Sequence, residues 1–159
     1  MTVAYVGLGA NLGEPRRQLQ AALQEMNSLP ETRVARTSGF YRSAPVGYLD
    51  QPDFVNAVAE VDTGLSAEKL LEHLQDIEQK HGRERSFEGA PRTLDLDLLL
   101  YGDTVLASPR LTLPHPRMHE RAFVLAPLSE IAPTIAIPGH GSARALLAAC
   151  RNQNVERIA

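Results

Sequence analysis

The chain has 159 residues, 43% of them hydrophobic and 22% charged, and its formal net charge is −3. This length suits one domain with a real core, and we expect a single domain over residues 1–159. The negative charge argues against a general nucleic-acid binder, and no apolar run approaches the roughly 20 residues of a membrane span. Cys150 is the only cysteine and Thr2 leads straight into a strand pattern, so we expect a cytoplasmic protein without a secretion leader.

The chain opens with a predicted strand and helix. Residues 3–8 form a short apolar run, and the glycines of residues 7–13 fit a tight turn better than a dinucleotide-binding fingerprint. Pro15 suits the first position of a helix, whose apolar stripe ends before Pro30. No Gly-Lys-Ser or Gly-Lys-Thr follows a glycine loop, which excludes a P-loop.

Two strands and a second helix are predicted next. Residues 32–42 and 54–61 have strand patterns, and a loop containing proline and glycine separates them. Ser66 can cap a helix that ends at Gly82. Beside its apolar stripe this helix carries two polar side chains that we expect to face solvent by default, Gln75 and Glu78.

The most informative stretch is Pro-Arg-Thr-Leu-Asp-Leu-Asp-Leu-Leu-Leu-Tyr at residues 91–101. Strand alternation puts its even-numbered leucines on one face and Asp95 and Asp97 on the other, with the aspartate Cα atoms roughly 6.5–7 Å apart. Two carboxylates this close repel each other unless a cation lies between them, and Mg²⁺ is commonly held by one or two carboxylates plus substrate phosphates. The pattern predicts a magnesium–phosphate site, and an amphipathic strand with a solvated acidic face is the alternative.

Arginine residues precede this strand. Arg83 and Arg85 lie in a polar loop, and Arg92 follows just before the aspartates. A guanidinium binds phosphate through a bidentate fork, so the combination fits phosphoryl transfer. Simple charge pairing between arginine and aspartate is the alternative.

The last third of the chain predicts smaller elements. After a short hairpin, residues 114–121 open a further helix, and His115 and His119 there could suggest zinc. The prolines beside His115 disturb a regular helical spacing and no third ligand is adjacent, so we do not predict zinc. A short strand at residues 134–137 and a helix at residues 142–150 follow, and we expect the tail to fray.

The predicted order is strand, helix, strand, strand, helix, strand, followed by a small C-terminal extension. This order is that of the ferredoxin-like fold of the α+β class, in which helices pack on a mainly antiparallel sheet. The fold by itself does not specify a function.

Seven segments resemble the 6-hydroxymethyl-7,8-dihydropterin pyrophosphokinases of folate biosynthesis. They are residues 9–13, 40–43, 51–57, 75 with 78, 82–83, 91–97 and 113–118. The Pro-Arg-Thr-Leu-Asp-Leu-Asp run is specific, whereas the glycine segment alone is not. The resemblance implies transfer of pyrophosphate from ATP to the hydroxymethyl oxygen of the pterin, which releases AMP. It implies these two small molecules as partners, with no nucleic acid or membrane, and we expect a monomer.

The resemblance also implies roles for individual residues. Asp95 and Asp97 would hold two Mg²⁺ ions that bridge the phosphates. Arg83, Arg92 and Asp97 would be catalytic, and Asp97 is a candidate acceptor for the hydroxyl proton. The ATP site would be lined by Gln75, Glu78, Arg83, Arg92, Leu98, Arg110, Thr112, His115 and Arg121. The pterin pocket would be lined by Ser43, Ala44, Pro45, Val46, Phe54, Asn56 and Phe123, with the two phenylalanines on opposite faces of the ring.

Two other activities fit the residues taken alone. One is a metal-dependent phosphohydrolase that uses Asp95, Asp97 and His115. The other is a ferredoxin-like regulatory domain that binds a small ligand without chemistry. The chain also departs from many relatives, because its loop before the Pro-Arg-Thr run lacks a Trp and Phe54 stands where a Tyr is common.

Overall fold

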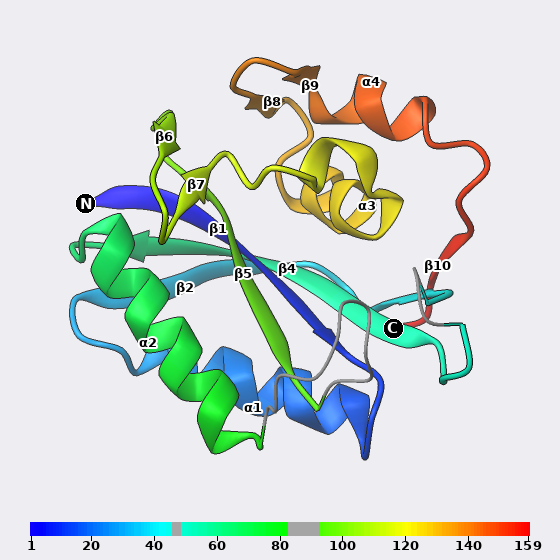
Figure 1. Ribbon diagram of the computed structural model, residues 1–159, viewed down its shortest axis with the longest axis horizontal. Coiled ribbons are helices and arrows are strands. Elements are labelled where there is room, and N and C mark those ends of the chain that lie inside the picture. The colour runs from blue at the N-terminus through cyan, green and yellow to red at the C-terminus, as the bar shows by residue number, and fades with distance from the viewer. Residues whose placement is uncertain (46–48, 83–92) are drawn as a thin grey trace.

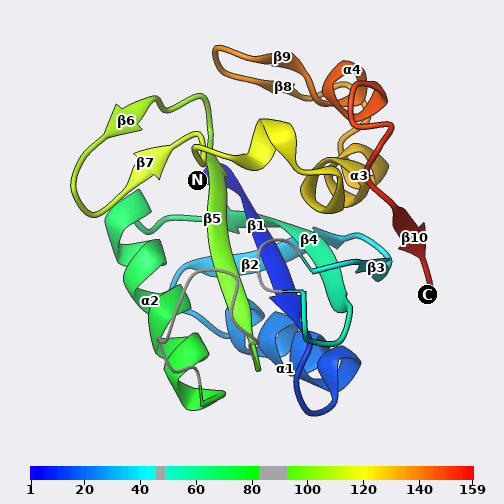
Figure 2. The same cartoon turned by 45° about the vertical axis from the view of Figure 1, so that its right-hand side comes forward.

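A central sheet organises the computed structural model, which describes residues 1–45, 49–82 and 93–159. Its strands are β1 (Thr2–Ala10), β2 (Thr32–Thr37), β3 (Tyr41–Ser43), β4 (Phe54–Thr63), β5 (Asp95–Tyr101) and β10 (Val155–Arg157). They lie in the order β10–β3–β4–β1–β5, with β2 also paired to β4, and all these pairs are antiparallel (Figure 1). Strand β5 therefore forms one edge of the sheet, beside α2 (Ala67–Lys80) (Figure 2).

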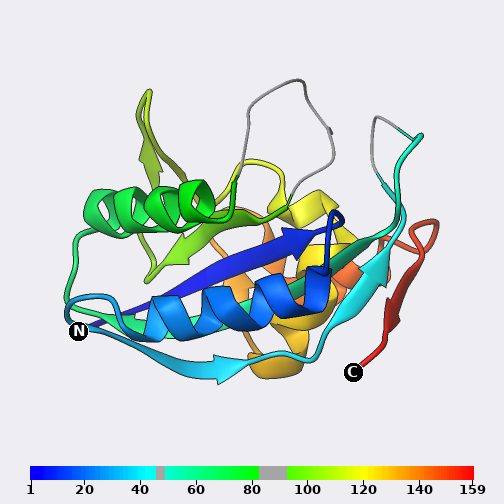
Figure 3. The ribbon, with the colours of Figure 1, turned by 90° about the horizontal axis from the view of Figure 1, so that it is seen from below.

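Helices cover both faces of this sheet. The helices α1 (Pro15–Asn27) and α2 pack on one face, and α3 (Ala122–Ile131) and α4 (Ala143–Ala148) belong to the core on the other face. In Figure 3, α1 lies in front of the sheet and α3 behind it. The smaller elements are β6 (Leu106–Ala107), β7 (Thr112–Leu113), the 3-10 turn η1 (Met118–Glu120), β8 (Ala136–Ile137) and β9 (Gly141–Ser142). The ferredoxin-like prediction is confirmed, and α3 and α4 form the predicted extension.

The first two helices form where their local signals predict. Pro15 occupies the first turn of α1, and the Ser66 hydroxyl caps α2 by accepting a hydrogen bond of 3.2 Å from the Lys69 N–H. Leu19 of α1 and Leu74 of α2 are fully buried against the sheet. No helix within the described ranges combines the length and apolarity that a membrane span requires.

The predicted strand over residues 32–42 is wrong as a single element, because it divides into β2 and β3. Between them, the Ser38 hydroxyl accepts a hydrogen bond of 2.9 Å from the Val58 N–H. The Gly39 N–H donates to the Glu130 carboxylate of α3 instead of continuing the ladder. Two side chains, Ser38 within the break and Glu130 of α3, thus take backbone hydrogen bonds that a continuous ladder would use.

Two predictions for the C-terminal third are also wrong. Residues 114–121 do not open a helix: η1 is a single turn, and Arg121 is extended (φ −113°, ψ 109°) before α3 begins. The tail does not fray, since β10 pairs with β3 and Val155 lies opposite Ser43. Pairing with a strand more than 100 residues earlier supplies the hydrogen bonds that the tail alone lacks.

The glycines of residues 7–13 do not share one turn, contrary to the prediction. Gly7 and Gly9 lie inside β1, and the turn begins only after Asn11, with Gly13 at φ 65°. A Cβ atom at Gly9 would lie 3.2 Å from the Asn56 Oδ1 atom of β4, which is a tight contact. Glycine is therefore used here for space on the sheet rather than for a turn.

The leucine alternation of β5 ends one step earlier than predicted. Leu96 and Leu98 pack in the core with α1 and α2, but Leu100 lies with Leu99 in the core that includes α3. The register with β1 shifts between Tyr5 and Val6, as in a β-bulge, where two consecutive side chains can face the same side. The bulge follows the aspartates, so their predicted common face is retained.

Candidate active site

The two aspartates lie opposite two glycines of the neighbouring strand. Asp95 is opposite Gly9 of β1, and Asp97 is opposite Gly7. Both aspartates are partly exposed, and the face they share is opposite to the buried leucines. The glycines add no side chain beside the carboxylates, and carboxylate oxygens are ligands that Mg²⁺ prefers. The residue types therefore fit a hydrated magnesium ion.

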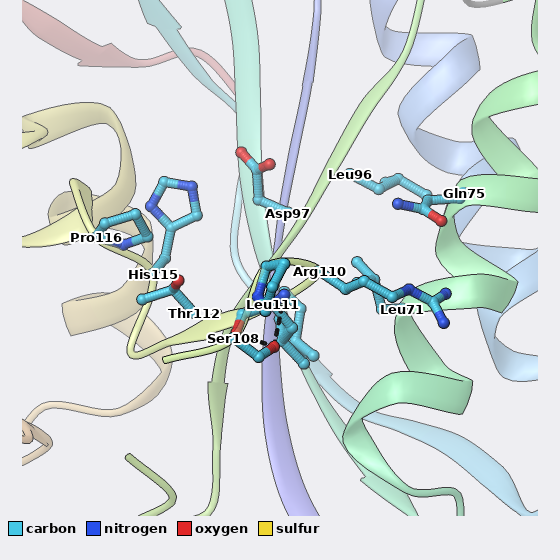
Figure 4. Close-up of a pocket in the computed structure, with 12 residues that line it drawn as sticks. Leu71, Gln75, Leu96, Asp97, Ser108, Arg110, Leu111, Thr112, His115 and Pro116 are labelled. Carbon is cyan, nitrogen blue, oxygen red and sulfur yellow. Dashed lines mark hydrogen bonds between the residues drawn. The ribbon is translucent and has the colours of Figure 1, made fainter. Parts of the chain in front are cut away.

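A pocket of about 230 Å³ adjoins this acidic pair. It lies between β5, α2 and the turn at residues 108–112 (Figure 4). Six residues predicted for the ATP or metal site line it: Gln75, Asp97, Leu98, Arg110, Thr112 and His115. Figure 4 shows His115 and Gln75 on opposite sides of Asp97. Asp97 thus belongs both to the acidic pair and to the pocket wall.

His115 is held as a neutral hydrogen-bond donor. Burial lowers its pKa to about 4, with a further lowering from Arg121 that outweighs the opposite effect of Asp95. Its backbone N–H donates to the Leu99 carbonyl over 2.9 Å, and its ring Nδ1 accepts from the Arg117 N–H over 3.2 Å. Because Nδ1 is an acceptor, the proton of the neutral ring is assigned to Nε2. The site therefore offers an uncharged N–H donor at neutral pH.

Arg110 lies across the pocket from His115. Its guanidinium is 3.4 Å from the Glu72 carboxylate of α2, and both side chains are largely exposed. The same carboxylate is 3.3 Å from Lys69, and these two cations lower the pKa of Glu72. Exposed ion pairs of this kind contribute little to stability, so Arg110 can exchange Glu72 for a phosphate at little cost.

Glu78 of α2 is buried rather than exposed. It is 4% exposed and does not line the described pocket. Its Oε2 atom accepts a hydrogen bond of 2.8 Å from the Leu96 N–H, between the two aspartates. The default expectation of solvent exposure is therefore wrong for Glu78, because the outer edge of β5 offers a backbone donor that this carboxylate reaches.

The predicted pterin residues gather at the ends of β3 and β4. The Asn56 side-chain amide donates a hydrogen bond of 2.7 Å to the Ser43 hydroxyl, and both residues are buried. Phe54 lies opposite Ser43 in the ladder, and Ala44 and Pro45 follow β3. Phe123 lies on the same face of the sheet, where it packs with the core that includes α3. The centre of its ring is 5.5 Å from the guanidinium carbon of Arg121.

Sequence reasoning missed a partly buried pair of hydrogen bonds at the end of β1. The Asn11 side-chain amide donates to the Gln51 Oε1 atom over 2.8 Å and to the Pro52 carbonyl over 2.9 Å. This link fixes the segment that enters β4 just before Phe54. Gly9-Ala10-Asn11 and Gln51-Pro52 both occur in the family segments, but sequence spacing alone does not reveal that they meet.

Four residues singled out from the sequence lie outside the described ranges: Val46, Arg83, Arg85 and Arg92. His119, one of the two histidines considered for zinc, stacks on His140 with ring centres 3.8 Å apart. Within the described ranges, no three His, Cys, Asp or Glu side chains are grouped to hold a metal. A magnesium site here would therefore depend on the two aspartates together with ligand phosphates.

Comparison with known proteins decides the family. A sequence model of the family described as 7,8-dihydro-6-hydroxymethylpterin-pyrophosphokinase (HPPK) matches residues 5–133. The chain belongs to the HPPK family. Its curated relatives include 2-amino-4-hydroxy-6-hydroxymethyldihydropteridine pyrophosphokinases from Pseudomonas aeruginosa and Haemophilus influenzae, each 51% identical. The first alignment covers 97% of this chain and 95% of the relative, and the second covers 87% and 86%.

Solved structures agree with this fold. The Plasmodium falciparum HPPK-DHPS with pteroate has a TM-score of 0.72 at 12% identity, over 93% of this chain and 42% of that one. This chain thus spans less than half of that solved chain, and at this identity the likeness concerns the fold alone. The HPPK reaction, in which pyrophosphate passes from ATP to the hydroxymethyl group of 6-hydroxymethyl-7,8-dihydropterin in folate biosynthesis, is the reaction of this chain.

Proposed function

We propose that this HPPK-family reaction is magnesium-dependent and that Asp95 and Asp97 hold two Mg²⁺ ions at the pocket described above. The observation that carries the proposal is the double position of Asp97, on the acidic face of β5 and in the pocket wall. A phosphate chain that begins in the pocket can therefore reach both carboxylates. When bound, the metal would neutralise phosphate charge and polarise the phosphorus under attack.

The edge of β5 offers a place for the adenine base. Alternate residues of an antiparallel strand direct their backbone groups to the same side, and the Leu96 N–H points away from β1 toward Glu78. The backbone N–H and carbonyl of Leu98 therefore face the same outer edge, where Leu98 lines the pocket. A neighbouring acceptor and donor on adenine match this pair, and Leu71 adds an apolar wall.

Cationic and neutral donors then contact the phosphates. His115 supplies its Nε2–H, and Arg110, Arg121 and Thr112 supply further donors. We assign Arg83 and Arg92, which lie outside the described ranges, to the transferring phosphates, where charge increases during reaction. Their replacement by alanine should then lower kcat more than it raises the KM for ATP.

The pterin binds beside the acidic pair, across β1. Gly9 of β1 lies between Asn56 of β4 and Asp95 of β5 across the sheet. Because Gly9 has no side chain, the pterin ring can lie directly over its backbone. Ser43, Ala44, Pro45, Val46 and Asn56 surround its edge, and Phe54 and Phe123 stack on its faces. The hydroxymethyl oxygen attacks the β-phosphorus, the bond from that phosphorus to the α–β bridging oxygen breaks, and AMP leaves. Asp97 accepts the hydroxyl proton.

The reaction assay with aspartate variants tests the site. Asp95→Asn and Asp97→Asn should each reduce AMP formation in the presence of pterin by more than ~100-fold, because electrostatic groups of this kind contribute several kcal/mol. Asp103→Asn is the matched control, since Asp103 is exposed in the turn after the same strand. Near-normal turnover of either aspartate variant would refute the metal assignment.

The same assay separates the two alternatives. Phosphate release from ATP without pterin would indicate a hydrolase, and no turnover at all would indicate a binding domain. A monomeric state, a single domain over residues 1–159 and a cytoplasmic location remain predictions. Light scattering of the purified chain measures the first of these.

A further inference from the structure

We infer that Glu78 is a positioning residue for the acidic pair, acting through the backbone of Leu96 rather than by touching ATP. Its carboxylate is buried and accepts the Leu96 N–H over 2.8 Å. Leu96 is the residue between Asp95 and Asp97, so this hydrogen bond holds the centre of the three-residue segment that presents both carboxylates. The inference rests on the metal role proposed for these aspartates.

The position of β5 in the sheet explains why such a contact is needed. Among the described strands β5 pairs with β1 alone, and the Leu96 N–H lies on the side away from β1. An edge strand lacks a second ladder to fix its backbone. A carboxylate acceptor makes a shorter and stronger hydrogen bond with a backbone N–H than a neutral acceptor does. Glu78 therefore replaces, at one point, the missing neighbouring strand.

The surroundings of Glu78 show that packing alone does not require a carboxylate. The neighbouring buried positions of α2 are Leu70, Leu74 and Ile77, which pack in the same apolar core. Burying a polar side chain costs free energy that another apolar residue would not cost. The hydrogen bond to Leu96 is a function that an apolar side chain of similar size cannot perform.

Magnesium binding is sensitive to this kind of positioning. Mg²⁺ demands near-ideal octahedral geometry, so a small displacement of either carboxylate costs affinity. Residues that orient metal ligands through hydrogen bonds typically change metal affinity by about 10- to 100-fold when they are removed. We expect an effect in this range when the Leu96 hydrogen bond is lost.

A second hydrogen bond from the same strand provides the matched control. The Tyr101 hydroxyl donates a hydrogen bond of 2.5 Å to the Leu65 carbonyl, before the start of α2. It anchors the far end of β5, away from the aspartates. Tyr101→Phe removes a strand-anchoring hydrogen bond of the same region but leaves the Leu96 contact in place.

The test compares Glu78→Met, Glu78→Gln and Tyr101→Phe. Methionine keeps the approximate volume and removes the acceptor, whereas glutamine keeps an oxygen acceptor and removes the charge. Magnesium affinity is measured by calorimetry with an ATP analogue whose α–β bridge is a methylene group, because that bond breaks in the reaction. Hydrogen exchange of the Leu96 amide, followed by NMR without metal or nucleotide, reports the contact directly.

Glu78→Met should weaken Mg²⁺ binding by roughly 10- to 100-fold and accelerate Leu96 amide exchange. Glu78→Gln should keep the amide protected and lose less than about 5-fold, and Tyr101→Phe should change metal affinity by less than about 2-fold. Equal losses in the two Glu78 variants would show that charge, not the hydrogen bond, matters, and would overturn the inference. So would a loss in Tyr101→Phe as large as that in Glu78→Met, or an unchanged affinity in Glu78→Met. Failure of the metal role itself is distinguishable, because Asp95→Asn would then retain Mg²⁺ affinity.

Discussion

Gly9→Ala tests whether pterin binding requires the absence of a side chain at Gly9, beside Asn56. The new Cβ atom would lie 3.2 Å from the Asn56 Oδ1 atom and 3.9 Å from the Val55 carbonyl. The first distance is too short, so the Asn56 amide must shift by a few tenths of an ångström. Asn56 cannot shift freely, because it is 4% exposed and donates a hydrogen bond of 2.7 Å to Ser43.

The expected loss of pterin affinity corresponds to one weakened hydrogen bond between the displaced Asn56 amide and the pterin. A typical neutral hydrogen bond contributes about 0.5–1.5 kcal/mol, and losing that amount weakens binding by roughly 2- to 12-fold. The pterin Kd should rise by this factor. The strain at Asn56 acts against folding, but alanine also reduces the conformational entropy of the unfolded chain relative to glycine. This second effect is about 0.4–1 kcal/mol in favour of folding, so the two effects are of similar size. A selective loss of pterin affinity without a lower melting temperature is therefore the predicted signature.

Calorimetric titration with pterin, in the presence of the methylene-bridged ATP analogue, measures this Kd. Gly7→Ala is the matched control, because Gly7 lies two residues away on the same strand and the three atoms nearest to its Cβ atom would all belong to the Leu99 side chain, at 3.4 Å or more. It should leave pterin affinity within about 2-fold. The decisive comparison is Gly9→Ala in an Asn56→Ala background, where the cost should disappear because its partner atom is gone. An undiminished cost there would refute the reasoning, since the new methyl group would then act on the ligand directly.

Three further outcomes follow from the site. The buried His115 has a pKa of about 4 against 6.5 in the unfolded chain, so the unfolded state binds more protons between these values and the free energy of unfolding falls as pH is lowered through that window. Urea unfolding at several pH values should show that His115→Gln removes about 3 kcal/mol of this fall. Glu72→Gln should lower the KM for ATP by at most about 5-fold, and less at high salt, because it frees Arg110 and removes a nearby negative charge; a raised KM would contradict this. Phe123→Ala should weaken pterin binding by roughly 5- to 150-fold and leave ATP affinity within about twofold, whereas equal losses would indicate a purely structural ring.

Much of the fold could be predicted from residues that are neighbours in the sequence. Pro15 and Ser66 mark the starts of α1 and α2 because proline and serine satisfy the backbone requirements of a first helical turn. The alternation of β5 separates its aspartates from its leucines because successive side chains of a strand point to opposite faces. These features depend on neighbouring residues only, so the sequence contains them directly.

The missed features depend on contacts between distant segments. The break after β2 arises where Ser38 is hydrogen-bonded to Val58 and Gly39 to Glu130. The sequence around residues 38–39 does not predict either partner. The burial of Glu78 is of the same kind, because it depends on where the edge of β5 lies relative to α2. Residue spacing alone therefore does not predict which polar side chains replace hydrogen bonds of the strand ladder.

The register of β5 is the point at which the fold and the proposed chemistry depend on each other. One face of the strand is buried, the other presents Asp95 and Asp97, and the outer edge gives the Leu96 N–H to Glu78 and the Leu98 backbone to the pocket. A slip of one residue would bury both carboxylates and direct the Leu98 groups toward β1, so it would remove the metal and base sites together. The bulge opposite Tyr5 and Val6 lies beyond these residues. The sheet can therefore change its twist near the end of β5 without altering the alternation on which the site depends.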